Sequence, residues 1–368
     1  MRKVAVLGST GSIGTQALEI IHANPELELH SLLCGSNLDL LMQQREQFSP
    51  SVTAIDSPGG ECPGGIITGQ DILQKTIDGA DMVLNAIVGS AGLRASLICR
   101  ERGIKLALAN KESLVVGGEL LSDHIRAGGI IPVDSEHSTI FRCLHSEPRP
   151  VRSITLTASG GSVRDLPIEE LKNAGVDDIL NHPTWNMGAR ITVDSATMVN
   201  KAFEVIEARW LFSGINIDVV LHPQSIVHSF VRLEDGSWKA LLGKPDMKVP
   251  LQYALQYPGR ELELISDDCP LDWGTLEFSE LPRQRYPAFD LIVRAGQDGK
   301  TFPAAANAAD EIAIAAFLAR KISFGDITVV IEEVLKGHEA LEVSDFQTVM
   351  EADRVSRIDA ERIVRRLC

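Results

Sequence analysis

The sequence predicts an α/β protein in which a Rossmann-like domain with a parallel sheet is followed by an α+β domain and a small helical domain. Over residues 1–134, short apolar runs alternate with helical patterns, and a glycine-rich loop follows the first run. Helical patterns alone occupy residues 288–368. Alternating strands and helices are typical of βαβ units, whose strands pair in parallel. A chain of 368 residues is long enough for two or three domains.

The first domain, residues 1–134, contains six predicted strands. They are KVAVLG, LHSLLCG, VTAID, MVLNAIVG, IKLALAN and GIIPVD, with a predicted helix over residues 12–22 after the first. The run SPGGECPGG, at residues 57–65, is a predicted loop.

The second domain is predicted over residues 135–257 and has a different pattern. VRSITLTASGGS reads as a strand that ends in a glycine-rich loop, and residues 194–212 read as one helix with Asp194 or Ser195 as its N-cap. A strand region follows, in which EDGS indicates a hairpin turn. Four prolines mark residues 258–287 as a linker to the helical domain.

Composition excludes some classes of protein. The net charge of −15 argues against a nucleic-acid-binding surface, which needs a basic face. We see no bilayer-spanning segment and no hydrophobic signal segment, and the six cysteines form no C-x-x-C pair. We therefore expect a cytoplasmic protein with reduced cysteines that binds neither nucleic acid nor a membrane.

The loop in VAVLGSTGSIG predicts a dinucleotide site. Gly8, Gly11 and Gly14 lie between a predicted strand and a predicted helix, where a tight turn and a helix N-terminus can approach a pyrophosphate. The strand–turn–helix context favours this site over a glycine-rich turn without a ligand.

The end of the second strand indicates which dinucleotide binds. NAD enzymes usually place a carboxylate there for the ribose hydroxyls. This chain has Gly35, Ser36 and Asn37 instead, which favours NADP, although nearby Asp39 leaves NAD open.

The stretch IIPVDSEHSTIF predicts a metal site. Asp134 and Glu136 are two positions apart, so in an extended segment their side chains point to the same side. Such hard oxygen ligands suit Mg²⁺ or Mn²⁺. An isolated D-x-E is more often a solvated turn, but this one follows a core strand at the ligand-binding end of a parallel sheet.

A third carboxylate is available on the predicted helix 194–212. Asn200, Lys201 and Glu204 can share one face of that helix and offer an amide, an ammonium and a carboxylate to a polar ligand. The competing interpretation is a surface salt bridge between Lys201 and Glu204. We expect Glu207 to be solvated.

Two further stretches are candidates for a phosphate site and its lid. Ser159, in TASGGS, is flanked by flexible backbone N–H groups, and Ser195 stands at the predicted start of a helix, where the dipole favours an anion. Either could be only a turn or cap residue. His182, Trp185 and Met187 lie in NHPTWNMG, which we interpret as part of a lid over about residues 159–189. Trp185 could instead be an ordinary core residue.

Several longer motifs can be compared together along the chain. They are GSTGSIG, LANKESLV, VDSEHS, TASGGS, NHPTWNMG, ITVDSATMVNKAFEVIEA, LHPQSIVHS and KPDMKVPLQYAL. Taken together, they resemble the motifs of the 1-deoxy-D-xylulose 5-phosphate reductoisomerases almost from end to end. The resemblance implies conversion of 1-deoxy-D-xylulose 5-phosphate to 2-C-methyl-D-erythritol 4-phosphate, the committed step of the non-mevalonate isoprenoid pathway. It also implies NADPH, a divalent metal (Mg²⁺, Mn²⁺ or Co²⁺) and a homodimer.

The resemblance also assigns roles to individual residues. The implied metal ligands are Asp134, Glu136 and Glu204. The implied catalytic and substrate-binding residues are Lys111, Ser135, Glu136, Ser159, His182, Ser195, Asn200, Lys201 and Glu204. The implied cofactor-binding residues are Gly8, Thr10, Gly11, Ser12, Ile13, Gly14, Gly35, Ser36, Asn37, Asn110, Glu112 and Gly188. His137 and His228 match family histidines near the active site.

The chain departs from the family pattern at two positions. Many members carry a basic residue where this chain has Ser36, so the contact to the 2′-phosphate of NADPH is open. Asp310 stands where an asparagine is common.

Two other functions explain part of the pattern. A simple Rossmann dehydrogenase acting on a phosphorylated or amino-acid semialdehyde substrate would account for the first domain but leaves the three carboxylates without a purpose. A nucleotide-sensing regulatory protein would need only the glycine loop.

Overall fold

The computed structural model describes residues 1–145, 147–181, 187–259 and 269–368, which fall into two compact units. The first unit consists of Met1–Ser113, Leu121–Arg142 and Asp246–Asp267. The second consists of Leu114–Leu120, Cys143–Pro245 and Asp268–Cys368. The domain boundaries predicted from the sequence stay a prediction.

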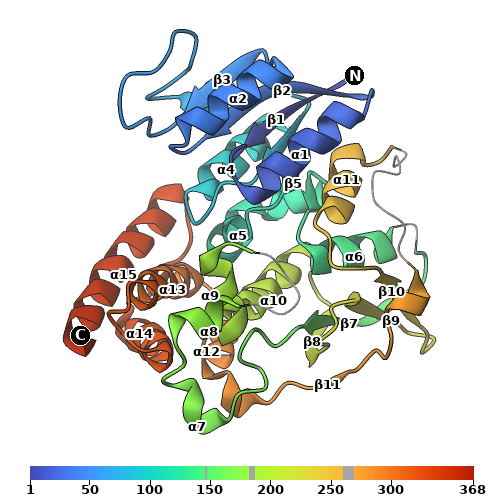
Figure 1. Ribbon diagram of the computed structural model, residues 1–368. Coiled ribbons are helices and arrows are strands. Elements are labelled where there is room, and N and C mark those ends of the chain that lie inside the picture. The colour runs from blue at the N-terminus through green and yellow to red at the C-terminus, as the bar shows by residue number, and fades with distance from the viewer. Residues whose placement is uncertain (146, 182–186, 260–268) are drawn as a thin grey trace. The chain divides into compact units, whose positions relative to one another are not determined.

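The first unit is built on a six-stranded parallel sheet in the order β3-β2-β1-β4-β5-β6 (Figure 1). Its strands are β1 (Arg2–Leu7), β2 (Leu27–Cys34), β3 (Val52–Ile55), β4 (Met82–Asn85), β5 (Lys105–Leu108) and β6 (Ile130–Pro132). Its helices are α1 (Ser12–Ala23), α2 (Leu38–Phe48), α3 (Ile72–Ile77), α4 (Gly92–Arg102) and α11 (Lys248–Gln256), with parts of α5 (Glu112–Arg126) and α6 (Ser135–Leu144). All six predicted strands and the predicted parallel sheet are confirmed.

Helix α11 completes the core of the first unit from a distant part of the sequence. Leu251 and Leu255 are fully buried in the apolar cluster that also contains Val4 and Ile131. The guanidinium of Arg2 donates to the carbonyl oxygens of Leu255 and Tyr257, each at 2.9 Å, and so joins β1 to the end of α11. A helix that is far from β6 in the sequence therefore packs against the first sheet.

The second unit contains a mixed sheet in the order β10-β9-β7-β8-β11. Its strands are β7 (Val151–Ala158), β8 (Asn216–Leu221), β9 (Val227–Leu233), β10 (Trp238–Leu242) and β11 (Ser279–Glu280). β7 and β8 are parallel, and the other pairs are antiparallel. The predicted hairpin is confirmed as β9–β10, and the predicted linker contributes β11 as an edge strand.

Helices make up the rest of the second unit. They are α7 (Ile168–Leu171), α8 (Val176–Leu180), α9 (Ala189–Thr197), α10 (Val199–Leu211), α12 (Pro287–Asp298), α13 (Phe302–Leu318), α14 (Phe324–Gly337) and α15 (Phe346–Leu367), with short 3₁₀ turns at Pro270–Asp272 and Arg283–Arg285. The predicted helical C-terminal region is confirmed by α12–α15 (Figure 1).

The predicted single helix over residues 194–212 is wrong. Met198 adopts a left-handed backbone with φ of 62°, which ends α9 and begins α10. The N-cap of α9 is Gly188, so neither Asp194 nor Ser195 caps a helix. Ser195 lies instead in the last turn of α9, where the helix dipole does not favour an anion.

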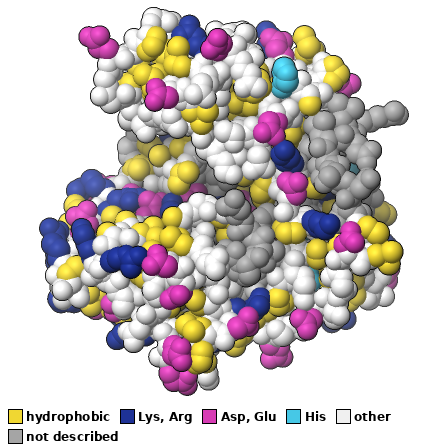
Figure 2. All heavy atoms as spheres, viewed as in Figure 1, with side chains coloured by type: hydrophobic (Ala, Val, Ile, Leu, Met, Phe, Trp, Pro, Cys, Tyr) yellow, Lys and Arg dark blue, Asp and Glu magenta, His cyan; other side chains and the backbone are white. Residues whose placement is uncertain are grey.

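Charges of both signs cover the exposed side of α15 (Figure 2). Arg354 pairs with Glu351 and Arg362 with Asp359, so these two arginines form ion pairs within the helix. Among the helices that the structure describes, none combines the length and the apolar character needed to cross a bilayer.

We predict that Leu255→Ala destabilises the protein by about 2–5 kcal/mol, because it leaves a cavity between α11 and the parallel sheet. Urea unfolding monitored by circular dichroism measures the change. Leu271→Ala is the matched control, since Leu271 is 91% exposed and loses little burial. Equal stability of the two variants would contradict the packing role of α11.

Candidate active site

The loop after β1 is packed too closely for side chains at two of its glycines. Gly8 has φ of +85°, and a Cβ there would lie 2.4 Å from the carbonyl oxygen of Ala86. A Cβ on Gly14 would lie 2.3 Å from the carbonyl oxygen of Gly8. The Gly8 N–H donates to the carbonyl oxygen of Leu33 at 2.8 Å. The approach of this loop to Ala86 therefore requires glycine at Gly8, and the approach of α1 to the loop requires glycine at Gly14.

The turn after β2 carries the other predicted cofactor residues. Gly35, Ser36 and Asn37 are exposed, and the side-chain oxygen of Asn37 caps α2 by accepting from the Leu40 N–H at 3.1 Å. No carboxylate occurs among these three residues. Asp39 is in the first turn of α2.

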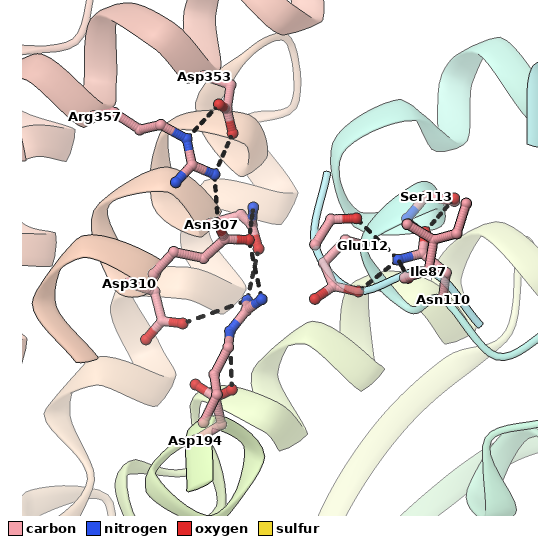
Figure 3. Close-up of polar contacts among 12 residues, drawn as sticks. Ile87, Asn110, Glu112, Ser113, Asp194, Asn307, Asp310, Asp353 and Arg357 are labelled. Atoms are coloured by element: carbon pink, nitrogen blue, oxygen red, sulfur yellow. Dashed lines mark hydrogen bonds and ion pairs between the residues drawn. The ribbon is translucent and has the colours of Figure 1, made fainter. Parts of the chain in front are cut away.

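Asn110 ties the turn after β5 to the loop after β4 (Figure 3). Its Nδ2 donates to the carbonyl oxygens of Ile87 and Gly89 at 2.7 and 2.9 Å, and to the Glu112 carboxylate at 2.9 Å. Its side-chain oxygen accepts from the Ser113 N–H at 2.9 Å. The buried amide therefore fixes the start of α5 and orients Glu112.

Asp134 begins a helix, so the predicted extended geometry of the D-x-E motif is wrong. The Glu136 N–H donates to Oδ1 of Asp134 at 3.2 Å, and the Ser138 N–H donates to the Asp134 carbonyl oxygen at 2.8 Å. Asp134 thus acts as the N-cap, with Ser135 and Glu136 in the first turn of α6. Capping overrides the extended conformation expected after a strand.

Two basic groups compensate the charge of Asp134. Lys111 donates to Oδ2, and Nδ1 of the buried His137 lies 3.1 Å from Oδ1. Burial of the carboxyl group opposes ionisation, but the charges of Lys111 and His137 outweigh it and hold the pKa of Asp134 well below its usual range. Asp134 is therefore an ionised oxygen donor at neutral pH. Beside it, the Ser135 hydroxyl donates to Glu136 at 2.6 Å.

In the second unit, the glycine-rich loop after β7 packs directly on α9. Gly161 has φ of +74°, and a Cβ there would lie 2.6 Å from Cα of Ala196 and 2.7 Å from the carbonyl oxygen of Ser195. The hydroxyl of the buried Tyr286 donates to the Gly160 carbonyl oxygen at 2.9 Å. This packing brings the loop of Ser159 next to Ser195. Sequence reasoning missed Tyr286, and only the paired glycines pointed to the close approach.

Helix α10 carries the third predicted carboxylate. Asn200 donates to Oε1 of Glu204 at 2.6 Å, and Lys201 donates to Oε2. Lys201 and Glu204 are 5% and 1% exposed, so the predicted shared face is confirmed and the surface salt bridge is wrong. The expectation that Glu207 is solvated is also wrong, since it is 1% exposed.

The remaining predicted residues are less constrained. Gly188 is the N-cap of α9, and Met187 precedes it. His182 and Trp185 lie outside the described residues, so the lid stays a prediction. The carbonyl oxygen of His228, on β9, accepts from the Thr157 hydroxyl at 2.8 Å.

A parallel sheet with a glycine loop between β1 and α1, bounded by a change of strand order, is the architecture of dinucleotide-dependent oxidoreductases. Three family models match the chain. They are 1-deoxy-D-xylulose 5-phosphate reductoisomerase over residues 4–118, its C-terminal domain over 130–212, and the DXP reductoisomerase C-terminal domain over 242–359.

Relatives of full length carry the same name. The 1-deoxy-D-xylulose 5-phosphate reductoisomerase of Exiguobacterium sibiricum is 44% identical over 97% of each chain, and that of Gloeobacter violaceus is 44% identical over 100% of this chain and 98% of its own. The chain belongs to the 1-deoxy-D-xylulose 5-phosphate reductoisomerase family.

Solved structures agree with this assignment. A DOX-P reductoisomerase in complex with NADPH, fosmidomycin and magnesium has a TM-score of 0.92 and 34% identity, covering 99% of this chain and 98% of its own. The Zymomonas mobilis enzyme in complex with NADPH has a TM-score of 0.89 and 35% identity, covering 99% of both chains.

We predict that Gly161→Ala weakens binding of a phosphorylated substrate roughly 10- to 100-fold, because the new Cβ would push the Ser159 loop away from Ser195. The KM for the substrate measures the effect. Gly214→Ala is the matched control, since Gly214 also has a positive φ, of +82°, but a Cβ there meets nothing within 4 Å. An unchanged KM in Gly161→Ala would show that the loop position does not matter for binding.

Proposed function

We propose that the protein catalyses the NADPH- and divalent-metal-dependent rearrangement and reduction of 1-deoxy-D-xylulose 5-phosphate to 2-C-methyl-D-erythritol 4-phosphate. The observation that carries the proposal is the identity of 44% to enzymes of this name over nearly the whole chain. The site adds chemical support, because an ionised carboxylate beside Lys111 suits a hard cation and an oxygen-rich substrate.

Asp134, Glu136 and Glu204 are the proposed metal ligands. Their donor set is all carboxylate, which fits Mg²⁺, Mn²⁺ or Co²⁺. Asp134 and Glu204 each already have a lysine beside the carboxylate, so neither is an uncompensated buried charge before the cation binds. When bound, a divalent cation acts as a Lewis acid that polarises a carbonyl and an adjacent hydroxyl oxygen.

NADPH is the proposed cofactor. The residues that would hold it are Gly8, Thr10, Gly11, Ser12, Ile13, Gly14, Gly35, Ser36, Asn37, Asn110, Glu112 and Gly188. When bound, NADPH supplies the hydride that reduces an aldehyde to an alcohol. The absence of a carboxylate at Gly35–Asn37 removes the group that would repel a 2′-phosphate, which supports NADPH over NADH.

The proposed substrate is a small phosphorylated sugar. Ser159, Ser195 and Asn200 would donate hydrogen bonds to its phosphate, and Lys201 would add positive charge. Lys111 and Ser135 would contact the oxygen atoms of its carbon chain. Both lysine side chains are largely buried, so their ammonium groups act in surroundings of low dielectric, where charge–charge interactions are strong.

The lid, the assembly and the location are also proposals. His182, Trp185 and Met187 would close over the substrate and exclude water, which protects a reactive intermediate. A homodimer and a cytoplasmic location are supported only by the family resemblance and by the expectations from the sequence.

The direct test is NADPH oxidation followed at 340 nm in the presence of 1-deoxy-D-xylulose 5-phosphate. We expect substrate-dependent oxidation that EDTA abolishes and added Mg²⁺ or Mn²⁺ restores. Binding of NADPH without turnover would instead support a nucleotide-sensing protein. Turnover of a semialdehyde that EDTA leaves unchanged would support a simple dehydrogenase.

We predict that Glu204→Ala leaves the protein folded but lowers kcat/KM by at least about 100-fold, because a buried carboxylate donor is lost. Turnover as a function of Mg²⁺ concentration is the measurement, and circular dichroism reports folding. Glu234→Gln, at an exposed position after β9, is the control and should behave like the wild type. Undiminished turnover of Glu204→Ala at limiting metal would exclude Glu204 as a ligand.

A further inference from the structure

A network of buried carboxyl groups joins α9 to α13 and α15 in the second unit. Figure 3 shows Asp194 of α9 and Asp310 of α13 converging on one polar cluster, which continues to Asp353 and Arg357 of α15. Asp310 is fully buried, and Asp194 and Asp353 are 6% and 3% exposed. None of these four residues belongs to the proposed metal or cofactor sites.

Two arginines supply the positive charge of this network. The guanidinium of Arg190, on α9, lies 3.0 Å from the Glu311 carboxylate. The guanidinium of Arg357 pairs with Glu311 and, at 2.6 Å, with Asp353. The network therefore holds four carboxyl groups and two guanidinium groups. Buried negative charge in such excess is unfavourable unless a proton neutralises part of it.

Of the carboxyl groups in this network, Asp310 has the weakest interaction with an arginine. The distance from Nη2 of Arg190 to Oδ2 of Asp310 is 4.0 Å, which is too long for a hydrogen bond. Within the described part of the chain, neither carboxyl oxygen of Asp310 accepts a hydrogen bond. The carboxyl groups of Asp310 and Asp194 lie beside the same guanidinium, since Arg190 is also 3.8 Å from Oδ2 of Asp194. Two carboxyl groups in contact can form a hydrogen bond only if one of them carries a proton.

The surroundings favour the protonated form of Asp310. Burial, together with the negative charges of Asp194 and Glu311, raises its pKa well above the usual range, although Arg190 acts in the opposite direction. These three residues are the charged groups that act on Asp310 from α9 and α13, and Arg357 and Asp353 continue the network from α15.

The pair lies directly behind a proposed phosphate contact. Asp194 precedes Ser195, and the backbone of Ser195 and Ala196 is the surface on which Gly161 packs. A contact that fixes Asp194 to α13 therefore also fixes the segment of α9 that faces the Ser159 loop.

We propose that Asp310 is a positioning residue for substrate binding: its carboxyl proton forms a hydrogen bond to Asp194 and thereby holds Ser195 in place for the substrate phosphate. This inference rests on the proposed function for the identity of the substrate. Protonation of Asp310 is a property of the folded chain, so it can be tested without measuring turnover.

The first experiment tests the proton through stability. The unfolded chain releases this proton near an ordinary aspartate pKa, whereas the folded chain keeps it to higher pH. The stabilisation that Asp310 contributes is therefore fully present at pH values below its pKa in the unfolded chain. It is lost as the pH rises toward the higher pKa of Asp310 in the folded chain. One proton corresponds to about a tenfold fall in the folding equilibrium constant per pH unit inside that window.

Urea unfolding from pH 5 to 8 should show this fall in the wild type and in the control Asp353→Asn, but not in Asp310→Asn. Asp353 pairs with Arg357 rather than with a second carboxyl group, so its removal leaves the proton in place. Parallel pH profiles for the wild type and Asp310→Asn would overturn the proposal.

The second experiment tests positioning through kinetics. We expect Asp310→Ala to raise the KM for 1-deoxy-D-xylulose 5-phosphate about tenfold with kcat nearly unchanged, since one hydrogen bond behind Ser195 is lost. Asp310→Asn should restore the KM, because its amide can donate to Asp194. It should also remove the rise of KM at alkaline pH that we expect of the wild type. The Asp353→Asn control should keep that alkaline rise.

The outcomes separate the two proposals. An unchanged KM in Asp310→Ala, or an Asp310→Asn variant that does not restore it, overturns the positioning role. If the wild type does not turn over this substrate, the proposed function fails, while the stability profiles still decide whether Asp310 holds a proton.

Discussion

Burial of a carboxyl group is costly unless a counter-charge or a proton accompanies it, and this constraint shapes the chemical part of the molecule. Asp134, whose side chain is 16% exposed, lies beside Lys111, and the buried Glu204 lies beside Lys201. Each is kept as an oxygen donor by a lysine that can also serve a polar substrate. Asp310 meets the same constraint without an adequate cation, and we infer a shared proton there. Compensation of a carboxyl charge, by a lysine or by a proton, is therefore common to these three residues.

Backbone geometry determines where the chemical groups of the proposed site lie. Six parallel strands bring their carboxyl ends to one edge of a sheet, so the glycine loop, the turn of Asn110 and the cap at Asp134 follow strands at the same edge. Close contacts between backbone segments then fix the positions of the loops around the site. Gly8 lets the loop after β1 approach Ala86, Gly14 lets α1 approach that loop, and Gly161 lets the loop after β7 approach α9. These positions tolerate no side chain, which makes the frame around the site rigid.

Local sequence patterns predicted the elements well and their junctions poorly. The spacing of apolar residues and the turn-forming residues between the apolar runs predict the strands of the first unit and the C-terminal helices. The helix predicted over residues 194–212 is two helices, because apolar periodicity continues across Met198 although its backbone turns left-handed. Asp134 and Glu136 were expected in an extended segment, yet Asp134 caps α6. In both cases one residue changed the outcome, through a left-handed backbone at Met198 and a side-chain cap at Asp134, and apolar periodicity registers neither.

The sequence by itself determined the order of strands and helices, the glycine loop and the chemical identity of the candidate ligands, since each depends on residues close together in the chain. Only the tertiary structure decided which polar groups are buried and what compensates them. Glu207 is buried rather than solvated, α11 completes a core begun by β1, and Asp310 lies beside the same arginine as Asp194. Burial and charge pairing depend on segments far apart in sequence, and their free energies are set by surroundings that no local pattern contains.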